Sequence, residues 1–595
     1  MSEQHLAVMI HEQAEKYNDR EVLYNKKGDE WISITWKSMA EQIDSGAKAL
    51  LEFGTQAGSN VAIFSQNRPE WALSDYSILT IGAVTVTIYA TNTPEQAEYI
   101  IDDAEINTVF VGGQEQYDAV MKFFGKNSNL KKVVVFEETT KIDAGPDVIY
   151  YEDFLNIGRQ SNRDNDIRES LEKAKTDDIC TIIYTSGTTG NPKGALLTHA
   201  NFYCQFNALN QRYPMGENDI ELCFIPLSHV YERCSSFWVL SKGARIYYCE
   251  DTSKIVDYFQ EVRPSYMVGV PRLYEKMYAA IHEQLKKASG TKQKLFMWGV
   301  ETGKQYRYKK IYGQRIPLSL TLKHAIAYTL VLKKVRALLG GKLNFFSAGG
   351  APLSKDIEEF FFAANIFIAQ GYGLTETAPI ITCNYPGKFK FGTVGSVIPD
   401  CEVRFAEDGE ILTRGKNVTQ GYFKKPDQNR QSFTDDGWFK TGDIGYIDEE
   451  GFLHITDRKK DIIVTAGGKN IAPQYIQSVI GQDFFIEQIV VIGDRKKFLS
   501  ALIVPSFDAL KEYAGENNIS FTSNEDLAGK QEIIDFYTDR INKLSEKLAH
   551  HEKIQKFILM PKEFSQDDGE ITPTMKIKRK VIQERYSSII NKMYE

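Results

Sequence analysis

A large layered α/β domain followed by a small α+β domain is the fold that this sequence predicts. From about residue 30 to 270, short runs rich in valine, isoleucine and tyrosine alternate with longer runs of helical spacing, which is typical of layered α/β structure. After about residue 390, strand and turn sequence replaces the helices. A chain of 595 residues also exceeds the size that one hydrophobic core supports. We therefore predict a large domain over residues 1–457 and a small mobile domain over residues 458–595.

The alternation can be followed element by element along the first part of the chain. The runs NVAIF (60–64), VTVTIY (84–89) and TVFVGG (108–113) have the composition of strands. Between them, PEWALSDYSILTIGA (69–83) and PEQAEYIIDDA (94–104) have helical patterns. These runs predict strands and helices that alternate in layers.

A glycine-rich stretch lies between a predicted strand and a predicted helix. ICTIIYT (179–185) is typical of a buried strand, and THANFYCQFNAL (198–209) is typical of a helix capped by Thr198. The stretch between them, YTSGTTGNPKG (184–194), therefore lies at strand ends, where backbone can face a ligand.

Residues 276–340 differ from their surroundings and predict a mostly helical insertion in the large domain. They are rich in lysine and aromatic residues, with helical spacing in KMYAAIHEQLKKA and LVLKKVRALL. Solvated helices are one interpretation of this stretch. A lid or a membrane-facing surface is the other.

The carboxyl-terminal part predicts the small α+β domain. Beyond Pro473 the patterns indicate a helix at 474–480, strands at 488–493 and 498–504, a long helix at 531–548 and then a basic tail. We place the junction with the large domain near residues 457–461.

Composition and charge exclude several classes of protein. The 71 basic and 79 acidic side chains give a formal charge of −8, which argues against a general nucleic-acid binder. Seven cysteines without metal-ligand spacing indicate reduced structural thiols. The first residues lack a basic start and a signal-peptide core, so we expect a cytoplasmic protein. The run HAIAYTLVL (324–332) is far shorter than the roughly 20 residues of a spanning helix, and peripheral membrane contact stays open.

The stretch at 184–194 has the residue types that bind phosphate. Backbone N–H groups surround a phosphate only where the chain approaches closely, which suits Gly187 and Gly190. Lys193 adds a point charge, and the stretch lacks the glycine-lysine-serine/threonine ending of a Walker A loop. An ordinary glycine-rich turn is the alternative. The hydroxyl donors are Thr185, Ser186, Thr188 and Thr189.

With these residues, YTSGTTGNPKG resembles the signature loop of the AMP-forming acyl-adenylate ligases, a superfamily of acyl-CoA synthetases, peptide-synthetase adenylation domains and firefly-type luciferases. Further motifs of that family follow in the family's order and carry the resemblance over roughly residues 180–580. They are GGAPL (349–353), QGYGLTET (370–377), FKTGD (439–443), DRKKDIIVTAGGKNIAP (457–473) and TPTMKIKRK (572–580).

The resemblance implies a nucleotide site whose residue types suit their roles. Thr375 can donate to a phosphate oxygen, and Glu376, with Thr185, is a hard oxygen ligand for Mg²⁺. Asp443 can accept from both ribose hydroxyls, and Arg458 contacts the ribose or forms a structural ion pair. The remaining nucleotide-binding candidates are Ser186, Gly187, Thr188, Thr189, Gly190, Lys193, Gly349, Gly350, Ala351, Gln370, Gly371, Tyr372 and Gly373.

The small domain carries three further positions by resemblance. Lys576 matches the catalytic lysine, with a solvated or membrane-attracted basic tail as the alternative. Lys460 matches the hinge position. The turn at Gly467, Gly468 and Lys469 is brought against coenzyme A, although a plain hairpin explains its glycines equally well.

The implied reaction has two steps in one site. A carboxylate attacks the α-phosphate of ATP, giving an acyl-adenylate and pyrophosphate, and the thiol of coenzyme A then displaces AMP. The sequence contains no GxSxG nucleophile elbow, which fits a mechanism without an enzyme nucleophile. Because both Lys576 and the turn at 467–469 lie in the small domain, rotation about Lys460 would exchange them between the steps.

The substrate follows from a closer resemblance to long-chain fatty acid CoA ligases, in GAVTVTIYATNTPEQAEYII and KVRALLGGKLNFFSAGGAPL. PLSHVYERC (226–234) resembles the segment beside the acyl tunnel and places His229 near the reacting carboxylate, with a helix-capping histidine as the alternative. Arg233 stands where some long-chain members carry a gating tryptophan. A fatty acyl-AMP ligase that serves a carrier protein, a ligase for another acid, a luciferase-like oxygenase and a non-catalytic nucleotide-binding regulator are the competing interpretations.

Overall fold

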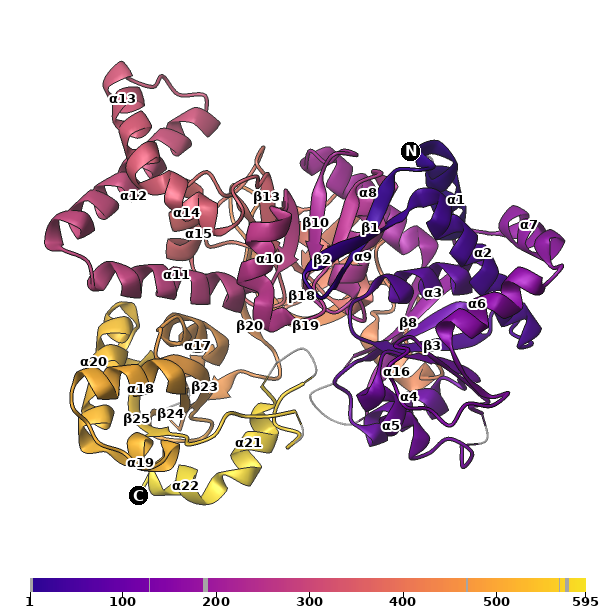
Figure 1. The fold of residues 1–595 in the computed structure, drawn as a ribbon. Helices are drawn as coiled ribbons and strands as arrows, with labels where there is room; N and C mark the ends of the chain where they lie inside the picture. Colours follow the sequence, from indigo (N-terminus) through magenta and orange to yellow (C-terminus); the bar gives the residue numbers. More distant parts are fainter. Residues whose placement is uncertain (1–3, 128, 186–190, 467–468, 567, 573–576) are drawn as a thin grey trace.

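The computed structural model describes residues 4–127, 129–185, 191–466, 469–566, 568–572 and 577–595. Figure 1 shows a large body of layered sheets and helices and a smaller unit made by the carboxyl-terminal residues. The predicted fold class, layered α/β with a small α+β domain, is confirmed.

One sheet of the large body is covered by apolar side chains on both of its faces. In β3 (Asn60–Ser65), Val61 and Ile63 pack with the helix α3 (Pro69–Thr80), whereas Ala62 and Phe64 pack with α4 (Pro94–Asp103). Successive strand residues point to opposite faces, so this sheet is covered on both sides. In sheet order its described strands are β7 (Val148–Tyr150), β6 (Lys132–Val135), β5 (Thr108–Val111), β3, β4 (Val84–Tyr89), β8 (Ile179–Thr185) and β9 (Lys193–Thr198).

The last two strands of that sheet form a hairpin around the glycine-rich stretch. β8 and β9 are antiparallel, with Thr185 opposite Lys193. The helix α8 (His199–Arg212) follows at once, and the Thr198 hydroxyl accepts from the backbone N–H of Asn201, which confirms the predicted cap.

The second sheet of the large body carries the GGAPL and QGYGLTET motifs, at the ends of two of its strands. Its central strands are parallel, so their carboxyl ends meet at one edge. In sheet order the described strands are β16 (Ser396–Val397), β15 (Ile380–Cys383), β14 (Ile368–Gly373), β13 (Phe345–Ala348), β12 (Tyr266–Gly269), β10 (Ile220–Cys223), β11 (Arg245–Tyr248), β1 (Glu21–Lys27) and β2 (Glu30–Thr35).

Further helices complete the large body. They are α1 (Leu6–Tyr17), α2 (Trp36–Glu52), α5 (Gln114–Met121), α6 (Tyr151–Gln160), α7 (Asp164–Lys173), α9 (Val230–Ser241), α10 (Ile255–Val262), α15 (Lys355–Ala363) and α16 (Pro426–Ser432). Within the described residues, every helix is too short or too polar to cross a membrane. None of the seven cysteines, all of which the structure describes, forms a disulfide.

The lysine-rich stretch after β12 is helical. It comprises α11 (Pro271–Lys286), α12 (Gly290–Ile311), α13 (Leu318–Ala327), the π-helix η2 (Tyr328–Leu332) and α14 (Lys333–Leu338). Val331, Leu332 and Val335 are buried against the second sheet, beside Phe346. The helices begin five residues before the predicted start of the insertion, because Pro271 opens α11.

A four-stranded antiparallel sheet leads to the junction of the two units. Its described strands are β17 (Cys401–Phe405), β18 (Glu410–Gly415), β19 (Phe439–Ile447) and β20 (Leu453–Arg458). The register places Asp443 directly opposite Arg458.

The carboxyl-terminal unit contains more elements than the sequence predicted, among them α18 (Phe507–Glu516), α19 (Asn524–Gly529) and β25 (Ile554–Leu559). The predicted helix at 531–548 ends at Leu544, and the basic tail forms α21 (Arg579–Arg585) and α22 (Ser587–Lys592). Ile582, Ile590 and Met593 are buried among other apolar side chains. Each tail helix therefore packs on the unit with an apolar side, which the interpretation as a basic tail did not include. The other elements are β21 (Ile463–Val464), β22 (Asn470–Ile471), α17 (Pro473–Gly481), β23 (Ile486–Ile492), β24 (Leu499–Pro505) and α20 (Gln531–Leu544).

The two units have separate hydrophobic cores. Among the described residues, the buried clusters of the carboxyl-terminal unit begin at Ile463 and contain no side chain of the large body. The units touch through Arg272 of α11, whose guanidinium donates to the carbonyls of Gly481 and Ile486, both at 2.7 Å. Separate cores support the predicted boundary near residue 458, which stays a prediction.

Candidate active site

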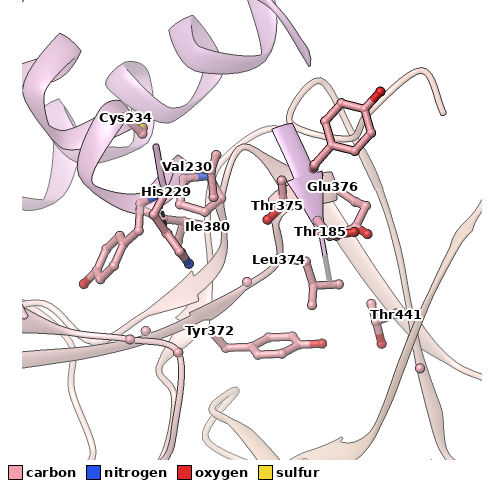
Figure 2. Close-up of a pocket in the computed structure, with 18 of the residues that line it drawn as sticks. Thr185, His229, Val230, Cys234, Tyr372, Leu374, Thr375, Glu376, Ile380 and Thr441 are labelled. Carbon is pink, nitrogen blue, oxygen red and sulfur yellow. Dashed lines mark hydrogen bonds between the residues drawn. The ribbon is translucent and has the colours of Figure 1, made fainter. Parts of the chain in front are cut away.

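A cavity of about 850 Å³ is lined by residues of both units. Figure 2 shows Thr185, Thr375 and Glu376 gathered on one side of it and His229, Val230, Cys234 and Ile380 on another. Lys460 and Lys578 line it from the carboxyl-terminal part of the chain. The cavity thus has a polar end and an apolar end. Residues of the large body and of the carboxyl-terminal unit both line it.

The polar end begins at the β8–β9 hairpin. Thr185 and Lys193 line the cavity, and the Thr185 hydroxyl donates to the Lys193 carbonyl at 3.4 Å. Burial lowers the pKa of Lys193, and the charge of Lys460 lowers it further. Two cations on one wall favour an anion between them. Ser186, Gly187, Thr188, Thr189 and Gly190 lie outside the described residues.

Glu376 is held in place by a buried tyrosine that the sequence did not indicate. The Tyr422 hydroxyl donates to a carboxylate oxygen of Glu376 at 2.7 Å, and the Thr419 N–H donates to the Glu376 carbonyl at 2.7 Å. Burial, and then the neighbouring Glu376 charge, raises the pKa of Tyr422, so this phenol stays a donor. The Lys193 ammonium lies 5.4 Å from the centre of the Tyr422 ring.

The donor set at this end fits Mg²⁺ bound together with phosphates. Thr375 and Glu376 belong to the short helix η3 (Thr375–Thr377) and line the cavity. Among the described residues, no cluster of three or more metal-ligating side chains occurs. Mg²⁺ is usually held by one or two carboxylates with substrate phosphates and water, so Glu376 and Thr185 suffice on the protein side.

The glycines of the GYGLT turn are required by close backbone packing. A Cβ on Gly373 would lie 1.8 Å from the Pro379 carbonyl oxygen, and one on Gly371 would lie 3.1 Å from the Thr382 carbonyl oxygen. Both glycines and Tyr372 line the cavity. No side chain fits at Gly373 without moving the turn that presents Thr375.

Gly373→Ala is therefore expected to lower adenylate formation by about a hundredfold, because it displaces the turn by a distance that matters for catalysis. It should also destabilise the protein by about 1–3 kcal/mol. ATP–pyrophosphate exchange and thermal unfolding measure the two effects. Gly216→Ala is the matched control, since its Cβ meets nothing within 4 Å. Wild-type exchange by the Gly373 variant would contradict this account of the turn.

Asp443 and Arg458 lie opposite each other in the four-stranded sheet. The Arg458 Nε lies 3.5 Å from one Asp443 oxygen, and the Tyr372 hydroxyl donates to the other at 2.7 Å. Tyr372 and Arg458 line the cavity, whereas the Asp443 side chain is largely buried between them. The ion pair is thus present, and contact of these groups with a ribose stays a prediction.

The GGAPL segment follows β13 at the cavity edge. Gly349 and Gly350 line the cavity, and a Cβ on Gly349 would lie 3.0 Å from the Tyr231 ring. Gly350 has φ +85°, which favours glycine, and Ala351 is exposed next to it. Gln370 is buried and accepts from the Leu353 N–H at 2.7 Å, so its side chain fixes this segment.

The capping interpretation of His229 is confirmed, and its place near the reacting carboxylate stays a prediction. His229 is the N-cap of α9, where its Nδ1 accepts from the Tyr231 N–H at 3.1 Å, and it also lines the cavity. Capping fixes the ring at the boundary between the polar and apolar parts of the wall.

Three aromatic rings that the sequence did not indicate line the apolar end. The Tyr213 and Phe345 rings stack with centroids 4.4 Å apart, and the Tyr266 ring lies 4.8 Å from that of Phe345. Tyr213 directly follows α8, Phe345 belongs to β13 and Tyr266 belongs to β12. Other apolar lining residues are Leu209, Val230, Val268, Ala369, Ile380 and Cys383.

Arg233 is buried and is not among the described residues that line the cavity. Its guanidinium is paired with Asp75 of α3, with Nε to Oδ2 at 3.0 Å, and both side chains are 1% exposed. The guanidinium also donates to the Thr181 hydroxyl on β8. Arg233 therefore ties α9 to α3 and to the strand that precedes the glycine-rich stretch.

Lys460 lies between Lys459, which contacts the large body, and Asp461, which contacts Arg579 of the small unit as well as Arg458. The Lys459 N–H donates to the Gly442 carbonyl at 2.9 Å, and its ammonium lies 2.8 Å from Glu410. On the other side, Arg579 donates to the Asp461 carbonyl at 3.0 Å. This change of attachment supports a hinge at Lys460, which stays a prediction.

The structure describes one residue of the predicted coenzyme A turn, Lys469, and the residues that flank the predicted catalytic lysine. Gly467, Gly468 and Lys576 lie outside the described residues. Lys469 is exposed, and its N–H donates to the Thr465 hydroxyl at 3.2 Å. Near position 576, Ile571 and Ile577 form a β-bridge, and Lys578 lines the cavity.

The cavity therefore has a cationic polar end and an apolar end, and residues of both units line it. The family described as AMP-binding enzyme matches residues 10–423, and its C-terminal domain matches residues 460–595. The chain therefore belongs to the AMP-binding enzyme superfamily and is an adenylate-forming acyl ligase.

Individual proteins extend this comparison. The chain is 35% identical over 593 residues to the long-chain-fatty-acid–CoA ligase FadD15 of Mycobacterium bovis, covering 99% of this chain and 97% of that protein. It is 29% identical to the long-chain-fatty-acid–CoA ligase ACSBG1 of Homo sapiens, covering 99% and 85%. The A domain of carboxylic acid reductase from Segniliparus rugosus, solved with AMP and a co-purified carboxylic acid, shares the fold with a TM-score of 0.76 at 19% identity, covering 100% of this chain and 94% of that one.

Proposed function

We propose that this protein activates a long-chain fatty acid and transfers it to coenzyme A. The carboxylate attacks the α-phosphate of ATP and expels pyrophosphate, and the coenzyme A thiol then attacks the acyl carbon and expels AMP. The observation that carries the proposal is the single cavity that joins the cationic polar end to the wall of Tyr213, Phe345 and Tyr266. The names of relatives at 35% and 29% identity support a long acyl chain.

The polar end would hold the triphosphate. The hairpin residues Thr185 and Lys193 would contact the β- and γ-phosphates as pyrophosphate leaves, together with the stretch 186–190. Glu376, fixed by Tyr422, would bind Mg²⁺, which supplies charge neutralisation at the phosphates when bound. Lys576 would bring an ammonium to the junction of carboxylate and α-phosphate.

The nucleoside and the acid would occupy the rest of the cavity. Gly349 and Gly350 would pass along the adenine, and Asp443 with Arg458 would face the ribose. His229 lies at the start of α9 and would orient the reacting carboxylate. The apolar wall would keep water from the acyl chain, because the Tyr213 and Tyr266 hydroxyls already have hydrogen-bond partners and most other side chains of this wall are apolar.

The test mixes purified protein with ATP, Mg²⁺, coenzyme A and saturated acids of graded length, and measures AMP and thioester. AMP and acyl-CoA in equal amounts, with the highest kcat/KM for long chains, are expected. AMP without thioester would favour transfer to a carrier protein, and ADP in place of AMP would contradict the mechanism. Preference for a short or aromatic acid would assign another substrate class.

Replacing Lys460 with proline should separate the two steps. Proline fixes φ and restricts the residue before it, which would block rotation between the anchored residues Lys459 and Asp461. We expect ATP–pyrophosphate exchange within about threefold of wild type and acyl-CoA formation lowered by about a hundredfold, the scale of a misplaced catalytic group. Lys460→Ala is the control, since it removes the charge without restricting the backbone. Equal loss of both activities in the proline variant alone would count against a hinge.

A further inference from the structure

The helices that follow α11 form an arm whose charge is opposite to that of the whole chain. We define the arm as residues 290–342, which comprise α12, α13, η2 and α14. It contains twelve lysine and arginine side chains against one acidic side chain, Glu301, a formal charge of +11. The whole chain has a formal charge of −8. Figure 1 shows α13 at the outer end of the arm, away from the sheets and from the carboxyl-terminal unit.

The arm also carries most of the exposed apolar side chains. Among the described residues, eight of the fourteen large apolar side chains that are exposed lie in it. Four of them form a stripe on α13 and η2, at intervals of four residues, and are between 46% and 75% exposed. Residues spaced by four share one face of a helix. The stripe is Leu318, Leu322, Ile326 and Leu330.

The helices of the arm pack against one another through the side of α13 and η2 that lies away from the stripe. The rings of Tyr306 in α12 and His324 in α13 stack with centroids 3.9 Å apart. A Cβ on Gly299 of α12 would lie 2.9 Å from Val331, so η2 contacts the α12 backbone closely. The helix is thus held in place by its other side, and the stripe stays exposed to solvent. An exposed apolar face on an anchored helix indicates an interaction surface.

The lysines near the stripe are free to meet an anionic surface. In the described part of the chain, Lys309, Lys310, Lys323, Lys333 and Lys334 have no carboxylate within ion-pair distance, whereas Lys304, at the base of the arm, pairs with Glu359. A cationic helix with an apolar stripe matches the interface of an anionic bilayer, where apolar side chains enter the acyl region and lysines face the headgroups. A nucleic acid would use the charges but leave the stripe in water.

We propose that the arm docks this protein on anionic phospholipid membranes, with α13 lying in the interface plane and its stripe among the acyl chains. The surface lies outside the cavity, and the inference does not rest on the proposed substrate. Docking would place the enzyme where apolar acids partition.

Vesicle sedimentation tests the proposal without any substrate. The full-length protein should bind vesicles of phosphatidylcholine with phosphatidylglycerol and bind pure phosphatidylcholine at least tenfold more weakly. The variant Leu318→Ser/Leu322→Ser/Ile326→Ser should lose about a hundredfold or more in affinity, because three apolar insertions are removed. Lys309→Glu/Lys310→Glu/Lys323→Glu should also lose about a hundredfold, at about fivefold per lysine, and wild-type binding should weaken in high salt.

A matched control tests whether the loss of binding is specific to the arm or follows from the removal of any three exposed apolar side chains. Ile32→Ser/Val256→Ser/Tyr446→Ser removes three comparably exposed apolar side chains from the large body and should bind like wild type. Circular dichroism and thermal unfolding verify that every variant is folded. Absence of binding to anionic vesicles, equal loss in the control, or binding retained by the stripe variant would overturn the proposal. Sedimentation velocity that shows self-association abolished by the stripe variant would overturn it as well, since the stripe would then belong to a second copy.

Discussion

Replacing Arg233 with alanine is expected to lower the free energy of unfolding of the large body by about 3–5 kcal/mol. The guanidinium pairs with Asp75 in a region where both side chains are 1% exposed, and it donates to Thr181. Within the described part of the chain, its removal leaves a buried carboxylate whose one remaining hydrogen-bond donor is the Thr85 hydroxyl, at 2.6 Å. Burial raises the pKa of Asp75 even with Arg233 present, so the remaining groups around this carboxyl do not offset the loss of its solvation.

Urea unfolding followed by tryptophan fluorescence measures this loss. Arg430→Ala is the control, because the Arg430–Asp427 pair is more than three-quarters exposed on both sides and should contribute about 0–1 kcal/mol. The double variant Asp75→Leu/Arg233→Met should regain much of the stability, since an apolar pair leaves no buried charge. An Arg233→Ala protein as stable as the control would contradict a structural role for the buried pair.

Replacing Lys576 with alanine is expected to lower ATP–pyrophosphate exchange by about 10²–10³-fold, the scale for removing one group that stabilises developing charge. Transfer from a supplied acyl-adenylate to coenzyme A should change little, because the second step does not need this ammonium. The motif TPTMK assigns the residue, and its described neighbour Lys578 lines the cavity.

Lys580→Ala is the matched control for that experiment. Lys580 lies in the same cationic run, but it is exposed and sits 4.0 Å from Glu584 on α21. If position 576 matters only as part of a basic tail, both variants should show similar small effects. Such a result would remove Lys576 from the proposed mechanism.

Sequence patterns predicted the elements that depend on local periodicity. The runs at 60–64, 84–89 and 179–185 form β3, β4 and β8, because each is a short apolar segment with turn residues beside it. The Thr198 cap was predictable for the same reason, since its hydrogen bond spans three residues. The tail helices were missed because the tail was interpreted by its charge alone, although Ile582, Tyr586 and Ile589 recur at the spacing of a helix.

The parts of the site that depend on distant contacts could not be predicted. Tyr213 meets Phe345 across more than a hundred positions, and each looks like an ordinary core residue in the sequence. Tyr422 fixes Glu376 in the same way, and no local pattern indicates it. Lys193, Thr375 and Glu376 were identified only because they stand within motifs, where the resemblance to a known family supplied what periodicity could not.

The most direct test of the central claim is a crystal structure with a non-hydrolysable long-chain acyl-adenylate analogue. The account predicts one analogue in the cavity, with its purine beside Gly349 and Gly350, its ribose facing Asp443, and its chain against the ring of Phe345. Lys576 should then contact the acyl–phosphate linkage from the carboxyl-terminal unit. An analogue bound elsewhere, with this cavity empty, would contradict the claim that both units build a single active site.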